Sequence, residues 1–416
     1  MNKIGIITLI SFALTSICKA QNVEVYSFSS QIETKISNDT VFWNYQTYAI
    51  EFVNIGEYRR NLEIEDVLKK SKLDKIGNSK LPDTANVKYL KSFKAVNAKK
   101  KIIEEAKKHR IIIINEEHNS PINRVFINSL LPDLKKIGYS IYLSEGVSNS
   151  FTLNKGDSLL NERKYPTLNS GFLLKEPQFG NLVRNALKNG YDVYGYDHPE
   201  DKTKTDFMER LQSRETGQAE NIIKILDENP SAKFLIHCGR GHLTETLTDS
   251  GFGFMGAMLK EKTGIDPFTI NQARLLETST ESTANPYRTE IDRNPPKKPS
   301  VFINEQNEYF DTYPDEKPWD VVVYFPTTNY KNGRPDWLFL NKKNKAFNIP
   351  KDKINIEAPY LIFAYHKDED IENVIPADIL EIGKDEEQKY LILEKGKYIL
   401  FIKGENGKTQ KIEIKV

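Results

Sequence analysis

The sequence is poor in cysteine and has almost no net charge, and each shortage excludes a class of protein. Only two cysteines, Cys18 and Cys238, occur in 416 residues, so the chain is not a small scaffold stapled by disulfides. Lys and Arg number 59 and Asp and Glu number 58, which leaves a formal net charge of +1. Such a balance creates no overall field to attract nucleic acid, and we expect no nucleic-acid partner.

Long apolar runs are also missing, except at the N-terminus. The run from Ile4 to Ile17 follows the basic Lys3 and precedes Cys18-Lys19-Ala20, the arrangement typical of a cleavable secretory signal. It is shorter than the roughly 20 residues that span a bilayer. We therefore expect residues 1–20 to be a signal peptide and the protein to be exported, whether periplasmic, outer-membrane-associated or secreted. A lipoprotein anchored through Cys18 is the alternative.

From about residue 93, strand and helix patterns alternate. Short runs of β-branched residues are typical of strands buried in a parallel sheet, and stretches with helical apolar spacing lie between them. The pattern predicts strands at 110–114, 140–143, 191–196, 233–237, 267–270 and 320–325, and helices at 121–137, 177–190, 205–227 and 253–262. This alternation predicts an α/β fold, a mostly parallel sheet with helices on both faces.

The patterns also divide the chain into parts. Residues 21–92 form a mixed segment, with β-type alternation at 23–32 and a helix at 57–70, which we expect to pack on the core. Residues 93–340 form the α/β core, interrupted by a long loop at 277–318 that is rich in Thr, Asn and Pro. Residues 341–416 predict a small all-β module, sandwich-like, with strands at 361–365, 379–382, 390–393, 398–402 and 411–416.

Acids and histidines follow four of the expected strands. In open α/β sheets, ligands bind beyond the carboxyl ends of the strands, so residues at these positions share one edge. They are Glu116, Glu117 and His118 after the first strand, Glu145 after the second, Asp197 and His198 after the third, and Arg240 and His242 after the fourth. The sequence therefore predicts a site at this edge.

The helix expected at 205–227 adds a charged pair to this edge. Glu215 falls in the middle of the apolar face of the helix, and a buried carboxylate is costly unless it is paired or used. Arg214 is adjacent. A buried ion pair without a catalytic role is the alternative. His237 lies within a strand, where it can face the core, and we expect His109 and His366 to be ordinary surface residues.

The segment from about 109 to 276 resembles the superfamily that contains erythromycin esterase, the ChaN-like haem-uptake proteins and the Tiki/TraB proteins. The family's Gly-Glu-x-His appears as Asn115-Glu116-Glu117-His118, with Asn in place of Gly. Its helix motif Arg-Asp-x-x-Met-Ala-x-Asn is matched by residues 214–221, with Glu215 in place of Asp and Gln218 in place of Met, and its Gly-x-x-His by residues 239–242. Glu145 and Asp197 match the acids after its second and third strands.

The resemblance and the residues together predict a hydrolase of an ester or amide bond in a small-molecule or peptide substrate. Glu116 or Glu145 would activate water, His118 or His242 would move a proton, and Arg214 would stabilise an oxyanion. Glu215 completes the expected catalytic set, and Asp197 and Arg240 are expected to bind substrate. No Gly-x-Ser-x-Gly elbow follows an expected strand, which argues against a serine hydrolase.

Three alternatives remain open at this stage. Glu116, His118, Glu145 and His242 could hold a divalent metal that activates water. Alternatively, the protein binds haem or iron without catalysis, with His118 or His242 as an axial ligand. Finally, the core could be a catalytically inactive interaction module.

Overall fold

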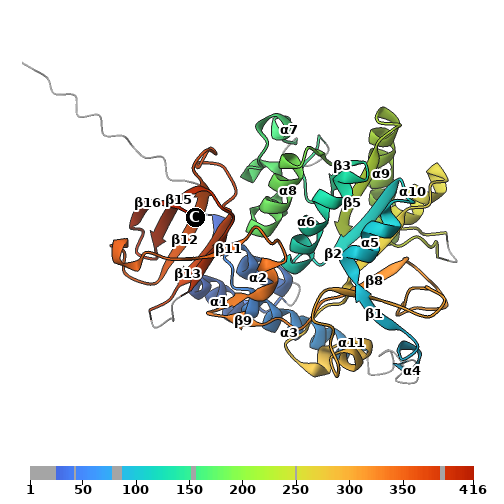
Figure 1. Cartoon of the computed structure of the whole chain (residues 1–416), viewed down its shortest axis with the longest axis horizontal. Coiled ribbons are helices and arrows are strands. Elements are labelled where there is room, and N and C mark those ends of the chain that lie inside the picture. The colour runs from blue at the N-terminus through green and yellow to red at the C-terminus, as the bar shows by residue number, and fades with distance from the viewer. Residues whose placement is uncertain (1–24, 42–43, 77–86, 151–155, 249–250, 385–388) are drawn as a thin grey trace, which may run out of the picture.

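The structure is a computed structural model, and it describes residues 25–41, 44–76, 87–150, 156–248, 251–384 and 389–416 (Figure 1). The expected signal peptide lies outside these residues. Within the described part of the chain, no helix is both long enough and apolar enough to cross a membrane.

The centre of the molecule is an eight-stranded sheet in the order β1-β7-β8-β6-β2-β5-β3-β4. Neighbouring strands from β8 through β6, β2, β5 and β3 to β4 are all parallel. At the other end of the sheet, β7 runs antiparallel to both β1 and β8. The strands are β1 Lys94–Asn97, β2 Ile111–Glu116, β3 Tyr139–Ser144, β4 Asp192–Gly195, β5 Lys233–Gly239, β6 Phe268–Leu275, β7 Ser300–Ile303 and β8 Val321–Tyr324. The predicted mostly parallel α/β sheet is confirmed.

Helices cover both faces of this sheet (Figure 1). One face carries α5 (Ala98–Ala106), α6 (Pro121–Lys136) and α8 (Pro177–Lys188). The other carries α9 (Phe207–Glu228) and α10 (Met255–Thr263). Strand alternation separates the two cores, because successive side chains point to opposite faces. In β2, Ile112 and Ile114 pack with α6, whereas Ile111 and Ile113 pack with α9 and α10.

The stretch expected as a long loop, 277–318, contains regular structure. It includes η6 (Glu281–Thr283), α11 (Pro286–Ile291) and β7, which joins the central sheet and pairs with β1. Neither β1 nor β7 was predicted as a strand. Each has only four residues, too few to produce a clear periodic signal, and their pairing comes from tertiary contact across about 200 residues of chain rather than from local pattern.

The N-terminal segment is helical, so the β-type alternation expected at 23–32 is wrong. The helices are α1 (Ser29–Asn38), α2 (Asn44–Asn54) and α3 (Tyr58–Ile76), and a short α4 (Val87–Leu90) follows. At the start of α1, the Gln31 side chain accepts a hydrogen bond from the Phe28 N–H, which satisfies one of the free donors at a helix start. Ile32 of α1 and Phe52 of α2 pack mainly against the C-terminal strands, not against the central sheet.

The C-terminal module is a β-sheet buried on both faces. Its main sheet has the order β13-β12-β15-β16, and a second pair of strands, β11 and β14, lies beside it. Alternate residues of β12 face opposite ways. Leu361 and Phe363 pack on the N-terminal helices, and Ile362 packs towards β11 and β14. The strands are β11 Lys345–Asn348, β12 Tyr360–His366, β13 Asp378–Ile382, β14 Tyr390–Leu393, β15 Lys397–Gly404 and β16 Thr409–Lys415.

A short connection joins the core to this module, with β9 (Tyr330–Lys331), β10 (Arg334–Pro335) and η7 (Asp336–Phe339). Within the module, η8 (Lys351–Lys353) lies between β11 and β12. The last two strands, β15 and β16, form a hairpin, and Gly407 in its turn has φ +81°. Between β3 and α8 the chain adds α7 (Leu160–Arg163), η4 (Leu168–Ser170) and η5 (Phe172–Lys175).

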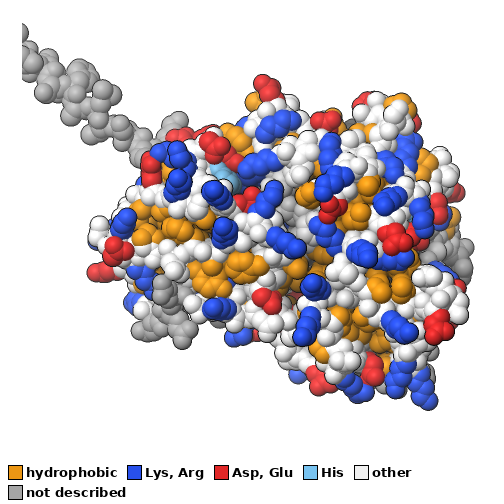
Figure 2. All heavy atoms as spheres, in the orientation of Figure 1, with side chains coloured by type: hydrophobic (Ala, Val, Ile, Leu, Met, Phe, Trp, Pro, Cys, Tyr) orange, Lys and Arg blue, Asp and Glu red, His pale blue; other side chains and the backbone are white. Residues whose placement is uncertain are grey.

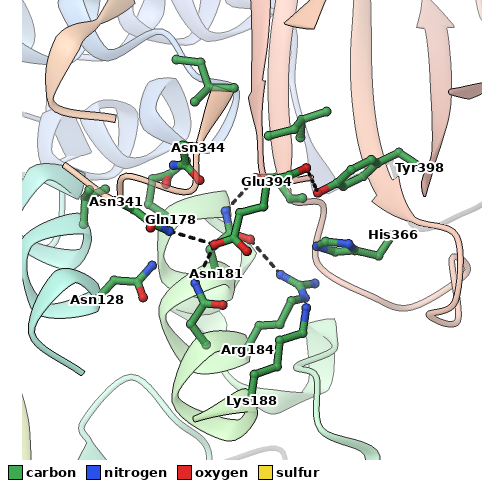
Figure 3. Close-up of a pocket in the computed structure, with 15 residues that line it drawn as sticks. Asn128, Gln178, Asn181, Arg184, Lys188, Asn341, Asn344, His366, Glu394 and Tyr398 are labelled. Carbon is green, nitrogen blue, oxygen red and sulfur yellow. Dashed lines mark hydrogen bonds between the residues drawn. The ribbon is translucent and has the colours of Figure 1, made fainter. Parts of the chain in front are cut away.

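A narrow polar cavity that opens to solvent lies between α8 and the C-terminal module (Figure 3). The Glu394 carboxylate accepts hydrogen bonds there from Asn341 (2.8 Å) and Asn185 (3.4 Å). His366, expected at the surface, instead lies in this cavity with its ring 4.7 Å from that of Tyr398. Burial, and then the charges of Arg184 and Lys188, lower the pKa of His366 to about 2, so the ring is neutral at physiological pH.

Candidate functional site

The residues that follow the strands come together because the parallel strands end in register. Glu116 at the end of β2 is paired with Gly239 at the end of β5. Ser144 at the end of β3 is paired with both His237 of β5 and Gly195 of β4. The loops that leave these strands therefore start side by side at one edge of the sheet, as expected for a parallel α/β fold.

On the α6 face of the sheet, Glu116 is held in a buried ion network. Arg124 of α6 donates to both Glu116 oxygens at 2.7 Å and to Glu176, the N-cap of α8, at 3.0 Å. The three side chains are at most 2% exposed. Burial would raise the pKa of Glu116, but Arg124 and then His237 hold it well below its ordinary value. Glu116 is therefore a fixed anion, not a group that exchanges protons with substrate.

Two histidines lie against this fixed anion, and His118 is hydrogen-bonded to it. His118 Nδ1 lies 2.9 Å from one Glu116 oxygen, and His237 Nε2 lies 3.0 Å from the other. The far nitrogen of His237 is 2.7 Å from the Tyr142 hydroxyl, and the ring is 1% exposed. His237 thus faces the core, whereas His118 remains partly accessible, with 29% of its side chain exposed.

On the α9 face, Glu145 is the centre of a second network. One of its oxygens accepts from Arg214 at 2.6 Å, and the other accepts from the Gly239 backbone N–H at 2.6 Å. Arg214 also donates to Asp197 at 2.8 Å, and Gln218 donates to the same Asp197 oxygen at 2.7 Å. Glu145 and Arg214 are 9% and 21% exposed, so this ion pair reaches solvent where the first does not.

Glu215 anchors the second accessible histidine. It is fully buried, as its place on the apolar face of the helix predicted, and it accepts from the Met255 N–H at 2.8 Å. His242 Nδ1 lies 2.8 Å from Glu215, and His242 Nε2 lies 3.3 Å from Glu145. A buried carboxylate thus fixes the orientation of His242, as Glu116 does for His118.

The carboxylates set the charge of these side chains. Burial alone would lower the pKa of His242, but the charge of Glu145 and the hydrogen bonds to Glu145 and Glu215 raise it to about 10. Burial would likewise lower the pKa of His118, but its hydrogen bond to Glu116 raises it above the ordinary value. Burial would raise the pKa of Glu145, but His242 and His118 together with Arg214 hold it well below the ordinary value.

The two networks meet at Gly239. A Cβ atom at this position would lie 3.1 Å from the Nε2 of His118 and 3.1 Å from a Glu145 oxygen. The two accessible histidines therefore share one geometry, with Nδ1 on a buried glutamate and Nε2 towards the space around Glu145. This arrangement brings together all six predicted catalytic residues and Asp197. It also adds Arg124, Glu176 and His237, which sequence analysis did not place in the site.

Some of the predicted residues lie at the margin. Arg240, expected to bind substrate, is 55% exposed and pairs with Glu117 at the rim. His198 points towards α9, where its ring lies against Gly217. Two site residues that were not predicted, His237 and Glu176, could have been found in part from the sequence. His237 is two residues from the core residue Leu235 of β5 and faces the same side, and Glu176 precedes Pro177 at the start of a helix, an N-cap position.

The arrangement fits a metal ion poorly. Among the residues that the structure describes, no group of three or more His, Cys, Asp or Glu side chains is placed to hold one. The physical reason is that each carboxylate is already neutralised. Arg124 takes both oxygens of Glu116, and Arg214 and a backbone N–H take those of Glu145.

Comparisons with known proteins give only weak similarities. No protein-family model matches the chain, and no curated protein matches its sequence. The solved structure of the type III effector HopBA1 is 15% identical, with a TM-score of 0.33, over 56% of this chain and 96% of that one.

Two further solved structures are similar at the same level. ChaN of Campylobacter jejuni, described with cofacial haem binding, is 10% identical over 55% of this chain and 92% of that one, with a TM-score of 0.34. RRSP, a MARTX toxin effector domain from Vibrio vulnificus, is 18% identical over 44% and 39%, with a TM-score of 0.31. At these values the similarities establish neither family nor function. What is defined is an α/β protein with paired Glu–His groups at the edge of its sheet.

Proposed function

We propose that the protein is an exported hydrolase that cleaves an ester or amide bond by attack of an activated water. One observation supports this most strongly, the convergence of two histidines, each fixed through Nδ1 by a buried glutamate, on the space around Glu145. Such carboxylate–imidazole pairs are suited to general acid–base catalysis because the carboxylate selects the tautomer and leaves Nε2 to the substrate.

The different surroundings of the two histidines suggest different roles. His118, whose hydrogen bond to Glu116 raises its pKa above the ordinary value, acts in its neutral form as the base that takes a proton from water. His242, with a pKa of about 10, is protonated and acts as the acid that donates to the leaving group. Arg214 lies 3.4 Å from His242 and supplies positive charge for the developing oxyanion. Glu145 remains ionised and orients Arg214 and the Gly239 N–H.

This division modifies the roles expected from sequence. Glu116 orients His118 instead of activating water, because Arg124 occupies both of its oxygens. A bound haem is supported less well. The accessible side chains beside the two histidines are Glu145, Asp197 and Arg214, which are charged and paired with one another, whereas a porphyrin needs a broad apolar surface.

The test is hydrolysis of a panel of esters, lactones and peptides by the purified protein and by the variants His118→Ala and His242→Ala. A general acid or base contributes about 10²- to 10⁴-fold to rate, so each variant should lose at least about 100-fold. His109→Gln changes a histidine that lies just before β2, at the opposite end of the strand from these loops, so this variant serves as the matched control and should retain full activity.

The outcomes are distinct. Turnover that both substitutions abolish, and that a chelator leaves unchanged, supports the proposed mechanism. If a chelator abolishes turnover, a metal and not His118 activates the water. No turnover of any substrate by folded protein would refute the hydrolase, and haemin titration monitored by absorbance would then test the binding alternative.

A further inference from the structure

The last strand of the C-terminal module, β16, forms an open edge of a β-sheet. It lies at the outer side of the module, at the end of the molecule opposite α10 (Figure 1). All seven residues from Thr409 to Lys415 pair with β15 in a regular antiparallel register. Neither a proline nor a register shift interrupts the strand, so its edge is continuous.

Half of the backbone groups of β16 point away from β15. The N–H of Val416 donates to the Gly396 carbonyl, and the N–H of Gly396 donates to the Val416 carbonyl. Such bonded pairs alternate with non-bonded pairs along an antiparallel ladder. The N–H and carbonyl groups that point outward therefore belong to Thr409, Lys411, Glu413 and Lys415. Among the residues that the structure describes, no hydrogen bond reaches these outward groups.

Two other edge strands are covered by side chains. At β4, the Asn161 side chain accepts from the Val193 N–H at 2.8 Å and donates to the Val193 carbonyl at 2.9 Å. At β13, Lys389 donates to the Glu381 carbonyl at 2.9 Å. Cover of this kind keeps an edge strand from pairing with another chain. The edge of β16 has no such cover within the described part of the chain, so its backbone groups are available to another strand.

One face of β16 carries the apolar core of the module out to this edge. Ile412 and Ile414, and Val416 just after them, pack on the core between the main sheet and the β11–β14 pair, but they remain partly exposed. Figure 2 shows hydrophobic side chains at the surface of the C-terminal module. A strand added beside β16 would bond to the outward backbone groups and also cover these side chains.

The other face of β16 carries exposed charges of alternating sign, Lys411, Glu413 and Lys415. Charges usually discourage the pairing of edge strands, but this pattern is complementary to itself. An antiparallel copy centred on Ile412, the middle residue of the strand, places each Lys411 opposite Glu413 of the other copy and pairs all seven residues. A centre at Lys411 or at Glu413 would place that residue opposite itself, and like charges directly opposite are destabilising.

We propose that β16 pairs with β16 of a second copy of the chain in an antiparallel, two-fold symmetric dimer centred on Ile412. The two four-stranded sheets then continue into each other across the interface, and the same surface serves both partners, as in other two-fold dimers. The Glu–His groups lie at the edge of the central sheet, not on this module, so the dimer does not depend on the proposed hydrolase.

Sedimentation velocity over a wide range of protein concentration measures the association. We expect a monomer–dimer equilibrium for the unchanged protein. Lys411→Glu places like charges opposite each other at two symmetric positions and should weaken the dimer at least about 10-fold. Adding Glu413→Lys to the same chain exchanges the two charges and should restore the dimer. Lys224→Glu, the same change of charge at an exposed position of α9, is the matched control.

Crosslinking tests the register of the two strands. In the proposed dimer the two copies of Ile412 face each other with Cα atoms about 4.5 Å apart, a separation that a disulfide spans. Ile412→Cys should therefore form a covalent dimer on oxidation. Gln410→Cys should not, because its Cα lies roughly 13 Å along the strand from its counterpart. The buried thiol of Cys238 does not compete.

Three results would overturn the proposal. They are a monomer at every concentration, equal crosslinking of the two cysteine variants, and a double charge variant that associates no better than Lys411→Glu. Circular dichroism spectra establish that each variant is folded. If Ile412→Cys does not fold, the exchange of charges still decides, because Lys411 and Glu413 are exposed.

Discussion

Two glutamate–arginine pairs lie on opposite faces of one sheet, and they differ in burial more than in geometry. Glu116–Arg124 is 2% and 1% exposed, whereas Glu145–Arg214 is 9% and 21% exposed. The first pair anchors His118 through Glu116, whereas His242, which lies beside the second pair, is anchored by Glu215. The buried pair can only orient its neighbours, because nothing from solvent reaches it, whereas the accessible pair can also contact a substrate. The same chemical pair is thus structural on one face and a candidate for function on the other.

The largest difference should appear when each arginine is removed. Arg124→Met leaves Glu116 and Glu176 as uncompensated buried charges, and breaking a buried pair costs about 3–5 kcal/mol. Arg214→Met removes a less buried pair and leaves Glu145 with its hydrogen bond from the Gly239 N–H, so the loss of stability should be smaller, about 1–2 kcal/mol. Urea unfolding measures both. Equal losses for the two variants would contradict the division into a structural and a functional pair.

The point where the two networks meet should be sensitive to one methyl group. Gly239→Ala places a Cβ 3.1 Å from His118 and from Glu145, which must move apart. A misplacement of about 1 Å can cost about 100-fold in rate, so we expect activity to fall at least 10-fold while stability changes by about 1 kcal/mol or less. The comparison of kcat with the midpoint of urea unfolding checks this. Gly251→Ala, whose Cβ meets no atom within 4 Å but which is strained by a φ of +78°, shows what a loss of stability alone does to kcat. Full activity in Gly239→Ala would show that catalysis does not depend on the close approach of His118 and Glu145 at this position.

The pH profile should distinguish the two histidines. Activity that requires neutral His118 and protonated His242 rises through the pKa of His118, above 6.5, and falls near pH 10. Glu215→Gln removes one of the groups that raise the pKa of His242, so the falling limb should move to lower pH while the rising limb stays. Glu116→Gln should move the rising limb to lower pH. A profile of kcat/KM against pH measures both limbs. If Glu215→Gln moved the rising limb, or Glu116→Gln the falling limb, His118 would be the acid and His242 the base.

The smallest effect concerns a histidine outside both networks. The folded protein keeps His366 neutral down to about pH 2, whereas the unfolded chain binds a proton below about pH 6.5. Unfolding is therefore favoured as pH falls below 6.5, and His366→Phe should remove this dependence. The free energy of unfolding of the variant should fall less between pH 7 and pH 5, by about 1–2 kcal/mol. Parallel curves for the two proteins would show that His366 is protonated in the fold.

Much of the core was predictable because it has strong local signals. The run of four isoleucines from Ile111 to Ile114 forms a buried strand as expected, and Pro121 begins the helix that follows. The position of Glu215 on an apolar helix face predicted a buried, paired carboxylate. These features depend on side-chain period and on backbone preferences of single residues, which are visible along the chain.

The remainder depends on contacts between distant segments. β1 and β7 form strands because they pair with each other, and α1 is a helix despite an alternating start because Ile32 packs on the C-terminal sheet. In the site, the acids and histidines at the strand ends were predictable from the sequence. The role of Arg124, which occupies Glu116 and changes it from a base into an anchor, was not predictable, because it depends on how α6 and β2 pack.

The packing of the N-terminal helices on the last strands has a consequence for the order of synthesis. During translation, Ile32 and Phe52 emerge among the first residues, but their apolar partners Phe363 and Phe401 are made more than 300 residues later. At about 5–20 residues per second, this apolar surface stays exposed for many seconds. Over that interval the central sheet can fold while the N-terminal helices wait, which makes them the part of the nascent chain with the greatest need of a chaperone.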